Sequence, residues 1–457
     1  SCSLDGLRET QRAIGRGVIT DITYEVQGKI SRTGQPCSDV FVSGYDRDLP
    51  VGLRVQGVED ALRSRVLLVD RSHWGLISVK GEDRLRFLHS QSTNNFEGAV
   101  TGEIHVIPAC IVTNTGRMVD YCECVVLPDE IKLLCSPNRW QTLLETFNKF
   151  IFPMDRVTVT SASEETAIFT IAGPEALEKL LALGCSANPA PGKVLTWTFN
   201  GEEVRVLGSS NLEPLEEGER LSRKENFDSV TEYTLLVPSA VAAELWEMFA
   251  SVSCLTLAGE DEWQFLRIKQ GIPFAGKELT KDYNPLQAGL WHSVHFDKGC
   301  YIGQETISRV NAYNAVKSQL FGVVFTEGGE VEEGTILFLE GAKERAGVVT
   351  SMMDLKMTSK CQGLAYVNKK TGGVGLKVSL VVTEGGVTGR IFDIPYPTRS
   401  DVESAQPPVK KASEEAKEQT GQLEDEVAKE ASRKAAKLEA MQKKLDALKA
   451  ARKKTAS

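Results

Sequence analysis

The chain has 457 residues, of which 41% are hydrophobic and 25% charged, and this composition excludes collagen-like, mucin-like and wholly disordered proteins. The net charge of -9 excludes a basic surface for non-specific nucleic-acid binding, and no apolar run approaches the roughly 18 residues of a membrane span. We therefore expect a soluble protein with neither a nucleic-acid nor a membrane partner. Ten cysteines are too sparse here for a disulfide scaffold and favour a reducing compartment.

The length predicts two or three domains, and we divide the chain into an extension over 1–49 and a folded region over 50–315 made of two α+β subdomains. Strands are predicted at 66–70 and 76–79, and hairpin turns follow. The clearest helix spans 136–150, with Ser136 as its candidate N-cap. The apolar residues expected on one face of this helix are Trp140, Leu143, Leu144 and Phe147.

The second subdomain repeats the alternation of strands and helices. A strand over 166–172 precedes a helix that starts near Pro174, and further strands are expected at 203–207 and 232–237. Three leucines of the helix are expected to point inward: Leu177, Leu180 and Leu181. The acidic stretch between the two strands, 213–228, is interpreted as a surface insertion.

The last third of the chain changes character twice. Residues 316–395 contain 13 glycines and several short alternating strands, which predicts a small β-barrel rather than a sandwich. Residues 396–457 form a linker and a charged tail rich in Ala, Glu and Lys. Two alternatives stay open for this helical tail: a solvated helix or disordered extension, and a helix that docks on a partner or self-associates.

The segment from Lys298 to Glu305 holds the densest group of chemically active side chains in the chain, with the sequence Lys-Gly-Cys-Tyr-Ile-Gly-Gln-Glu. Two glycines allow a tight turn and close approach to a ligand. A helix beginning after Gly303 would favour a thiolate at Cys300, and so would the neighbouring Lys298. The alternative is that Cys300 is a small buried hydrophobe, as most free cysteines are.

This segment resembles the signature of the YgfZ/GcvT family, folate-binding proteins related to the aminomethyltransferase of glycine cleavage. The Lys-Gly-Cys-Tyr-x-Gly-Gln-Glu motif matches along its whole length, and similar stretches occur in family order over residues 50–395. The supporting stretches are 69–75, 81–91, 266–273 and 284–290. Overall the chain looks most similar to plastid members from plants and algae.

The resemblance implies an α+β, GcvT-like multidomain fold around tetrahydrofolate, with a C-terminal β-barrel. Members with the cysteine motif are associated with tetrahydrofolate-dependent assembly or repair of iron–sulfur clusters, so iron–sulfur client or assembly proteins are the implied partners. Cys300 and Lys298 then belong to the catalytic set, and Tyr301, Gln304 and Glu305 to the folate-binding set. A chloroplast location is implied, with the mitochondrion as the alternative.

Three residues outside the signature are assigned by the same resemblance. Asp120 matches a carboxylate that lies against the folate one-carbon unit, Glu232 a pterin-binding glutamate, and Arg267 an arginine near folate, where a cation suits the glutamate tail. Alternation places Asp120 on one side of a strand with apolar neighbours, so its carboxylate needs donors or its pKa rises. The competing interpretations are a wet strand end for Asp120, an exposed carboxylate for Glu232 and a surface ion pair for Arg267.

No metal is expected. The histidines nearest the signature, His292 and His295, have no carboxylate or thiol at the spacing of a metal site. The sequence also has no pair of Cys-x-x-Cys motifs, which would indicate a zinc site or a cysteine-bound cluster. Cys122 and Cys124 are predicted to lie on the same side of a strand.

Three functions follow from these residues. The first is a tetrahydrofolate-binding protein for iron–sulfur cluster assembly or repair that acts through Cys300. The second is a folate-dependent aminomethyltransferase in which Asp120 orients the folate. The third is a scaffold that binds no folate and acts through its tail.

Overall fold

The structure of the protein is a computed structural model. It describes residues 57–58, 61–99, 104–190, 192–209, 232–251, 255–325, 331–353, 361–372, 377–379, 387–392 and 394. The predicted N-terminal extension, the acidic insertion and the helical tail lie outside the described residues. Within them, no helix combines the length and the apolar character needed to cross a bilayer.

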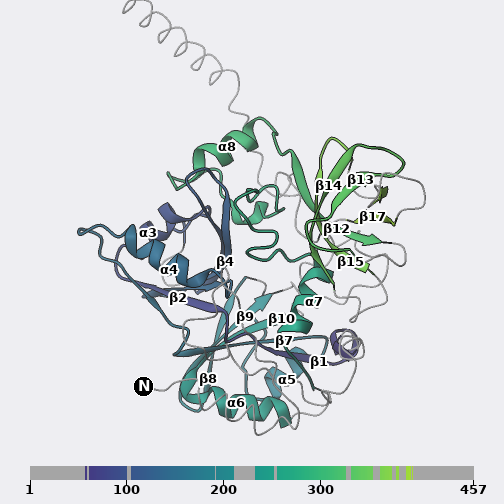
Figure 1. Ribbon diagram of the computed structural model, residues 1–457. Helices are drawn as coiled ribbons and strands as arrows, with labels where there is room; N and C mark the ends of the chain where they lie inside the picture. The colour runs from purple at the N-terminus through teal and green to yellow at the C-terminus, as the bar shows by residue number, and fades with distance from the viewer. Residues whose placement is uncertain are drawn as a thin grey trace, which may run out of the picture. The chain divides into compact units, whose positions relative to one another are not determined.

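The first sheet has six strands in the order β11-β1-β7-β10-β9-β8 (Figure 1). Its central strands are rich in β-branched and aromatic residues, and only the β1–β11 pair is parallel. The strands are β1 (Val66–Asp70), β7 (Thr166–Ala172), β8 (Val194–Phe199), β9 (Glu202–Ser209), β10 (Glu232–Pro238) and β11 (Leu255–Ala258).

Both faces of this sheet are covered, which is why all five residues of β1 are buried. Val66 and Leu68 face the cluster formed with α5 (Ala176–Ala182) and α6 (Ser239–Ser251). The alternate residues of β1 pack with α7 (Glu260–Gln270) and with barrel side chains. Helix α7 therefore joins the first sheet to the barrel, as Figure 1 shows.

The second sheet has five strands in the order β3-β4-β5-β2-β6, all antiparallel. One face packs against two helices, and the other packs on the first sheet, where Leu76 and Val125 meet Ile168 and Leu236. The elements are β2 (Gly75–Lys80), α3 (Arg84–Gln91), β3 (His105–Val112), β4 (Met118–Val126), β5 (Glu130–Cys135), α4 (Trp140–Lys149) and β6 (Thr158–Ser161).

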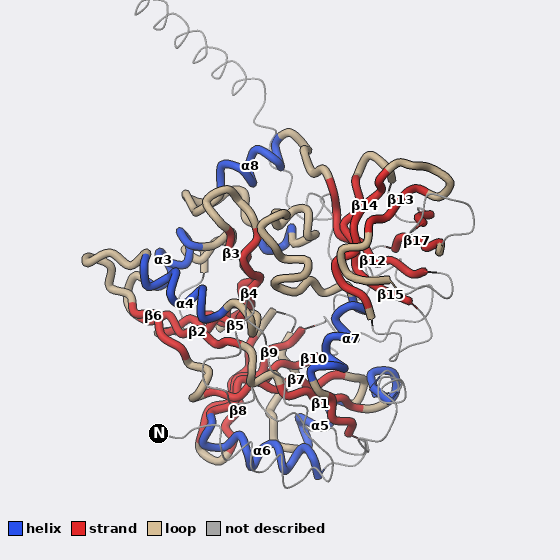
Figure 2. Tube along the Cα trace, viewed as in Figure 1, coloured by secondary structure: helices blue, strands red, loops and turns tan. Residues whose placement is uncertain are grey.

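The C-terminal strands close into a barrel in the order β12-β15-β14-β13-β16-β17, visible as a separate group of strands in Figure 2. Its interior is apolar. The strands are β12 (Ser318–Phe325), β13 (Ile336–Leu339), β14 (Arg345–Met352), β15 (Cys361–Asn368), β16 (Lys377–Ser379) and β17 (Thr388–Phe392). Along the chain, η1 (Trp291–Ser293) and α8 (Gln304–Ala312) come after α7 and before the first barrel strand. The predicted α+β fold with a C-terminal barrel is confirmed.

Two local predictions were wrong. Helix α4 begins at Trp140 rather than near Ser136, because the Ser136 hydroxyl donates to Asp120 on β4 instead of capping the helix. Leu181 was expected to point inward but is 45% exposed, since the seven-residue helix α5 turns only Ala176, Leu177 and Leu180 toward the sheet.

Candidate functional site

The signature segment leads into α8, which begins at Gln304, and is attached to the C-terminal end of α3. The Lys298 ammonium donates hydrogen bonds to the carbonyl oxygens of His89, Ser92 and Asn94, at 2.5, 2.9 and 2.6 Å. A lysine at this place satisfies carbonyls that the helix leaves open and complements the negative end of its dipole. Burial lowers the pKa of Lys298 to about 7, and the three carbonyls favour its charged form.

Backbone hydrogen bonds continue this attachment on both sides of Lys298. The amide of His295 donates to the Thr93 carbonyl at 3.0 Å, and the amide of Ile302 donates to the Ser90 carbonyl at 3.1 Å. The Thr93 hydroxyl donates to the Ser293 carbonyl at 2.6 Å. The signature segment is therefore held at Lys298 and Ile302, and the residues just before it are held at Ser293 and His295, by residues at and beyond the end of α3.

Gly303 forms the start of α8 and adopts a left-handed backbone with φ of 81°. A Cβ at this position would lie 2.6 Å from the Thr113 carbonyl oxygen and 2.9 Å from the Gly116 Cα atom. The turn between β3 and β4 thus packs directly against the second signature glycine. Only glycine meets both the backbone and the space requirement.

The side chains of the signature diverge into two directions. Cys300 is a free, exposed thiol, and Glu305 is also exposed, where it pairs with Arg309 at 3.5 Å. Tyr301 is buried, its ring lies 4.7 Å from the Lys298 ammonium, and its hydroxyl has no hydrogen-bond partner within the described part of the chain. Gln304 is half-buried at the start of α8. Lys298 is therefore engaged with α3 rather than with the Cys300 thiol, contrary to the electrostatic role expected from adjacency.

Asp120 is completely buried in β4, which excludes the wet strand end. It shares its side of the strand with Cys122 and Cys124, as the alternation predicted. Met118 was expected on the same side, but a β-bulge between Asp120 and Met118 pairs Met118 with Val112 and turns it to the opposite side. Its carboxylate accepts hydrogen bonds from the Ser136 amide (2.9 Å), the Ser136 hydroxyl (2.7 Å) and the Tyr121 amide (2.9 Å). Burial still raises the pKa of Asp120 to about 6.

Glu232 begins β10 and is 2% exposed, so it is not an exposed carboxylate. It acts electrostatically on Arg71, a buried guanidinium that directly follows β1. Two further carboxylates, Glu123 of β4 and Glu260 of α7, act on the same guanidinium. A buried charge is thus placed where both sheets and α7 meet.

Arg71 packs against two mutually perpendicular indole rings, with its guanidinium carbon 4.0 Å from the Trp74 ring centroid and 4.3 Å from that of Trp263. The Nε atom of Arg71 and both indole Nε1 atoms are buried, and no described residue supplies them with an acceptor. An unmade hydrogen bond of a buried donor costs about 1–3 kcal/mol, so these three donors suit a ligand or water that supplies acceptors. Neither Arg71 nor Trp263 carried a predicted role, although the 69–75 stretch contains Arg71.

Arg267 is also buried, at 2% exposure, which excludes a surface ion pair. Its guanidinium is bonded to Glu278 at 3.1 Å and to Ser351 of β14 at 3.0 Å. These contacts connect α7 with the barrel. They also engage the Arg267 guanidinium, which the resemblance had assigned to folate, with protein side chains.

The two histidines beside the signature differ in their surroundings. The His292 ring nitrogen Nε2 lies 3.3 Å from the Tyr121 hydroxyl, and burial lowers the pKa of His292 to about 4. His295 is half-buried beside the signature.

Comparison with known proteins shows which family the chain is similar to. The GCVT N-terminal domain family matches residues 54–207. A chloroplastic protein of Arabidopsis thaliana that is named as a transferase is 31% identical to this chain over 374 residues. The aligned region covers 81% of this chain and 79% of the relative. The chain belongs to the GCVT family. Membership of the GCVT family is thus confirmed, and the narrower resemblance to YgfZ stays a prediction.

Aminomethyltransferases are also similar to the chain, at lower identity. An aminomethyltransferase of Thermoanaerobacter pseudethanolicus is 25% identical over 336 residues, covering 71% of this chain and 84% of the relative. The solved structure of the glycine cleavage system aminomethyltransferase T from Bartonella henselae superposes with a TM-score of 0.65. The superposition covers 86% of this chain and 97% of that one at 16% identity, so it shows the shared fold.

Proposed function

We propose that this GCVT-family protein binds tetrahydrofolate and acts through Cys300 in the assembly or repair of iron–sulfur clusters. The observation that carries the proposal is the exposed, free Cys300 thiol on a segment fixed to α3 by Lys298. Thiolates are ligands for the iron of such clusters, and a ligand that serves a client protein must be accessible. The iron–sulfur cluster is the client's cargo in this proposal.

The buried donors around Arg71 fit a folate. A pterin carries a carbonyl and ring nitrogens that accept hydrogen bonds, and an amino group and N–H that donate them. The donors of Arg71, Trp74 and Trp263 suit the accepting edge, and the Glu232 carboxylate suits the donating edge. Bound tetrahydrofolate supplies a nitrogen that carries one-carbon groups. The guanidinium and the indoles would orient the ring and exclude water from it.

The test is restoration of a damaged [4Fe–4S] enzyme by purified full-length protein, with iron, sulfide and reductant supplied and with or without tetrahydrofolate. We expect restoration to require tetrahydrofolate and to be lost in Cys300→Ala. The matched control is Cys185→Ala, which removes a buried thiol from the cluster that α5 and α6 form with the first sheet. Equal restoration by Cys300→Ala and wild type would refute the proposal.

Aminomethyl transfer to tetrahydrofolate is the second candidate. It is supported by the names of the bacterial relatives and by the raised pKa of Asp120, to about 6, which suits a carboxyl that exchanges protons near neutrality. Purified protein, an aminomethylated lipoyl carrier and tetrahydrofolate would yield methylene-tetrahydrofolate if this function is correct. Absence of that product would exclude it.

We also propose a plastid location, supported by the chloroplastic Arabidopsis relative. Import of the full-length precursor into isolated chloroplasts, with mitochondria as the comparison, tests this. Iron–sulfur proteins of the plastid are then the proposed partners, and co-purification with a cluster-bearing client is the expected result.

A further inference from the structure

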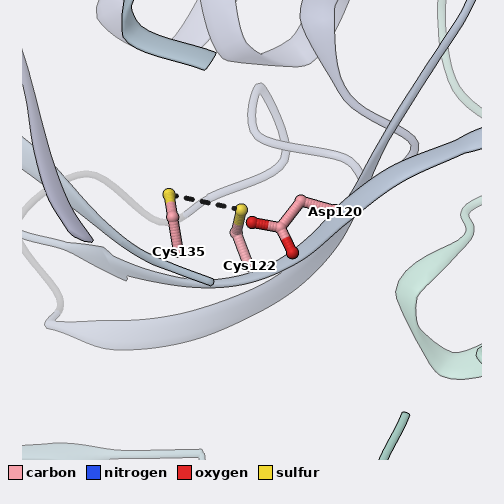
Figure 3. A group of neighbouring side chains, drawn as sticks. All are labelled: Asp120, Cys122 and Cys135. Carbon is pink, nitrogen blue, oxygen red and sulfur yellow. Dashed lines mark hydrogen bonds between the residues drawn. The ribbon is translucent and has the colours of Figure 1, made fainter. Parts of the chain in front are cut away.

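Three buried side chains of the second sheet bring metal-binding atoms together where sequence spacing predicted none. Asp120 and Cys122 project from the same face of β4, and Cys135 ends the neighbouring strand β5. Figure 3 shows the carboxylate and both sulfurs on one side of these strands, with the sulfurs turned toward each other. The ligand atoms all lie within 4.8 Å of one another.

The separation of the sulfurs is close to that of a tetrahedral dithiolate site. The Sγ atoms of Cys122 and Cys135 are 3.5 Å apart. Two sulfurs bound to one tetrahedral zinc ion at about 2.3 Å lie about 3.8 Å apart. An ion therefore needs the two sulfurs to move apart by only a few tenths of an ångström.

The carboxylate of Asp120 is held by hydrogen bonds, as metal-binding carboxylates usually are. Its two oxygens offer about four acceptor positions, and three are taken by the Ser136 amide, the Ser136 hydroxyl and the Tyr121 amide. Such outer hydrogen bonds fix a ligand in place and leave a lone pair for the ion. Apolar side chains of β2 and α4 belong to the same core cluster as Cys122 and Cys135, and all three candidate ligands are completely buried.

We propose that Asp120, Cys122 and Cys135 form a binding site for a divalent cation of zinc type. Each thiol gives up its proton when its sulfur binds the ion, so one dication enters and two protons leave to solvent. Two thiolates, one carboxylate and one dication leave a single negative charge. The site does not involve Cys300, and a bound ion would withdraw Asp120 from any direct part in folate chemistry.

The test uses Co²⁺ as the probe, because its thiolate complexes absorb in the near ultraviolet and zinc complexes do not. Full-length protein is stripped with a chelator, reduced, and titrated with Co²⁺ without oxygen. We expect one equivalent to produce sulfur-to-cobalt absorption that excess Zn²⁺ removes. Cys122→Ser and Cys135→Ser should lose this band, whereas Cys185→Ser and Cys300→Ser should keep it.

Asp120→Asn keeps the size of the side chain and tests the third ligand in a variant that circular dichroism shows to be folded. We expect its Co²⁺ dissociation constant to rise at least about tenfold. A band that persists in folded Cys122→Ser or disappears in Cys300→Ser overturns the proposal. It is equally overturned if non-reducing mass analysis shows a Cys122–Cys135 disulfide and the reduced protein binds no Co²⁺.

Discussion

Replacing Lys298 by methionine should loosen the signature segment without unfolding the protein. The change keeps an apolar stem of similar length and removes the donor to three carbonyl oxygens. A hydrogen bond from a charged donor contributes at least about 1.5 kcal/mol, so three give about 4–5 kcal/mol. Burial of the ammonium, which lowers its pKa to about 7, offsets part of this. We expect a loss of about 2–3 kcal/mol in the local opening free energy.

Hydrogen exchange followed by mass spectrometry measures this effect at the His295 and Ile302 amides, which donate to the Thr93 and Ser90 carbonyls. A loss of about 2–3 kcal/mol corresponds to exchange that is about 30- to 150-fold faster. Lys281→Met, which removes an exposed lysine, is the matched control. Exchange at these two amides that is no faster in Lys298→Met than in the control would show that the ammonium does not hold the segment.

Three further outcomes follow from the described contacts. Gly303→Ala should lower the free energy of unfolding, measured with denaturant, by about 1–3 kcal/mol more than Gly334→Ala does. Both glycines have a positive φ, but of the two only Gly303 lacks room for a Cβ, so equal losses would contradict this. His292 has a pKa of about 4 in the folded protein, so it stays neutral there down to about that pH. In the unfolded chain the same imidazole binds a proton below about pH 6.5, so the free energy of unfolding falls by up to about 3 kcal/mol between pH 6.5 and 4. His292→Gln should flatten that fall in unfolding measured across this range, and an unchanged slope would assign it to other groups. Arg71→Met should weaken tetrahydrofolate binding at least about tenfold by fluorescence titration, and unchanged affinity in a folded variant would exclude Arg71 from the site.

Local rules predicted the features that depend on neighbours in the sequence. The two glycines of the signature indicated a tight turn before a helix, and α8 begins directly after Gly303. Strand alternation placed Asp120 and Cys122 on one buried face. Composition and short alternating strands predicted the barrel, because a small closed sheet leaves a repeated local pattern.

The contacts that define the site could not be predicted because they join distant segments. Adjacency suggested that Lys298 serves Cys300, but the lysine reaches back to α3, about two hundred residues earlier in the chain. Ser136 has the character of a helix cap, yet strand pairing places it beside Asp120, which takes its hydroxyl. Cys122 and Cys135 meet only through the register of β4 and β5, so their spacing carried no metal signal.

Calorimetric titration of the full-length protein with tetrahydrofolate, without oxygen, tests the central claim most directly. We predict saturable binding at one equivalent, weakened at least about tenfold by Glu232→Gln, whose buried carboxylate is assigned to the pterin. Cys300→Ala should bind as wild type does, because the exposed thiol acts on a client rather than on folate. Absence of binding heat from the folded wild-type protein, or equal affinity in Glu232→Gln, would contradict the account.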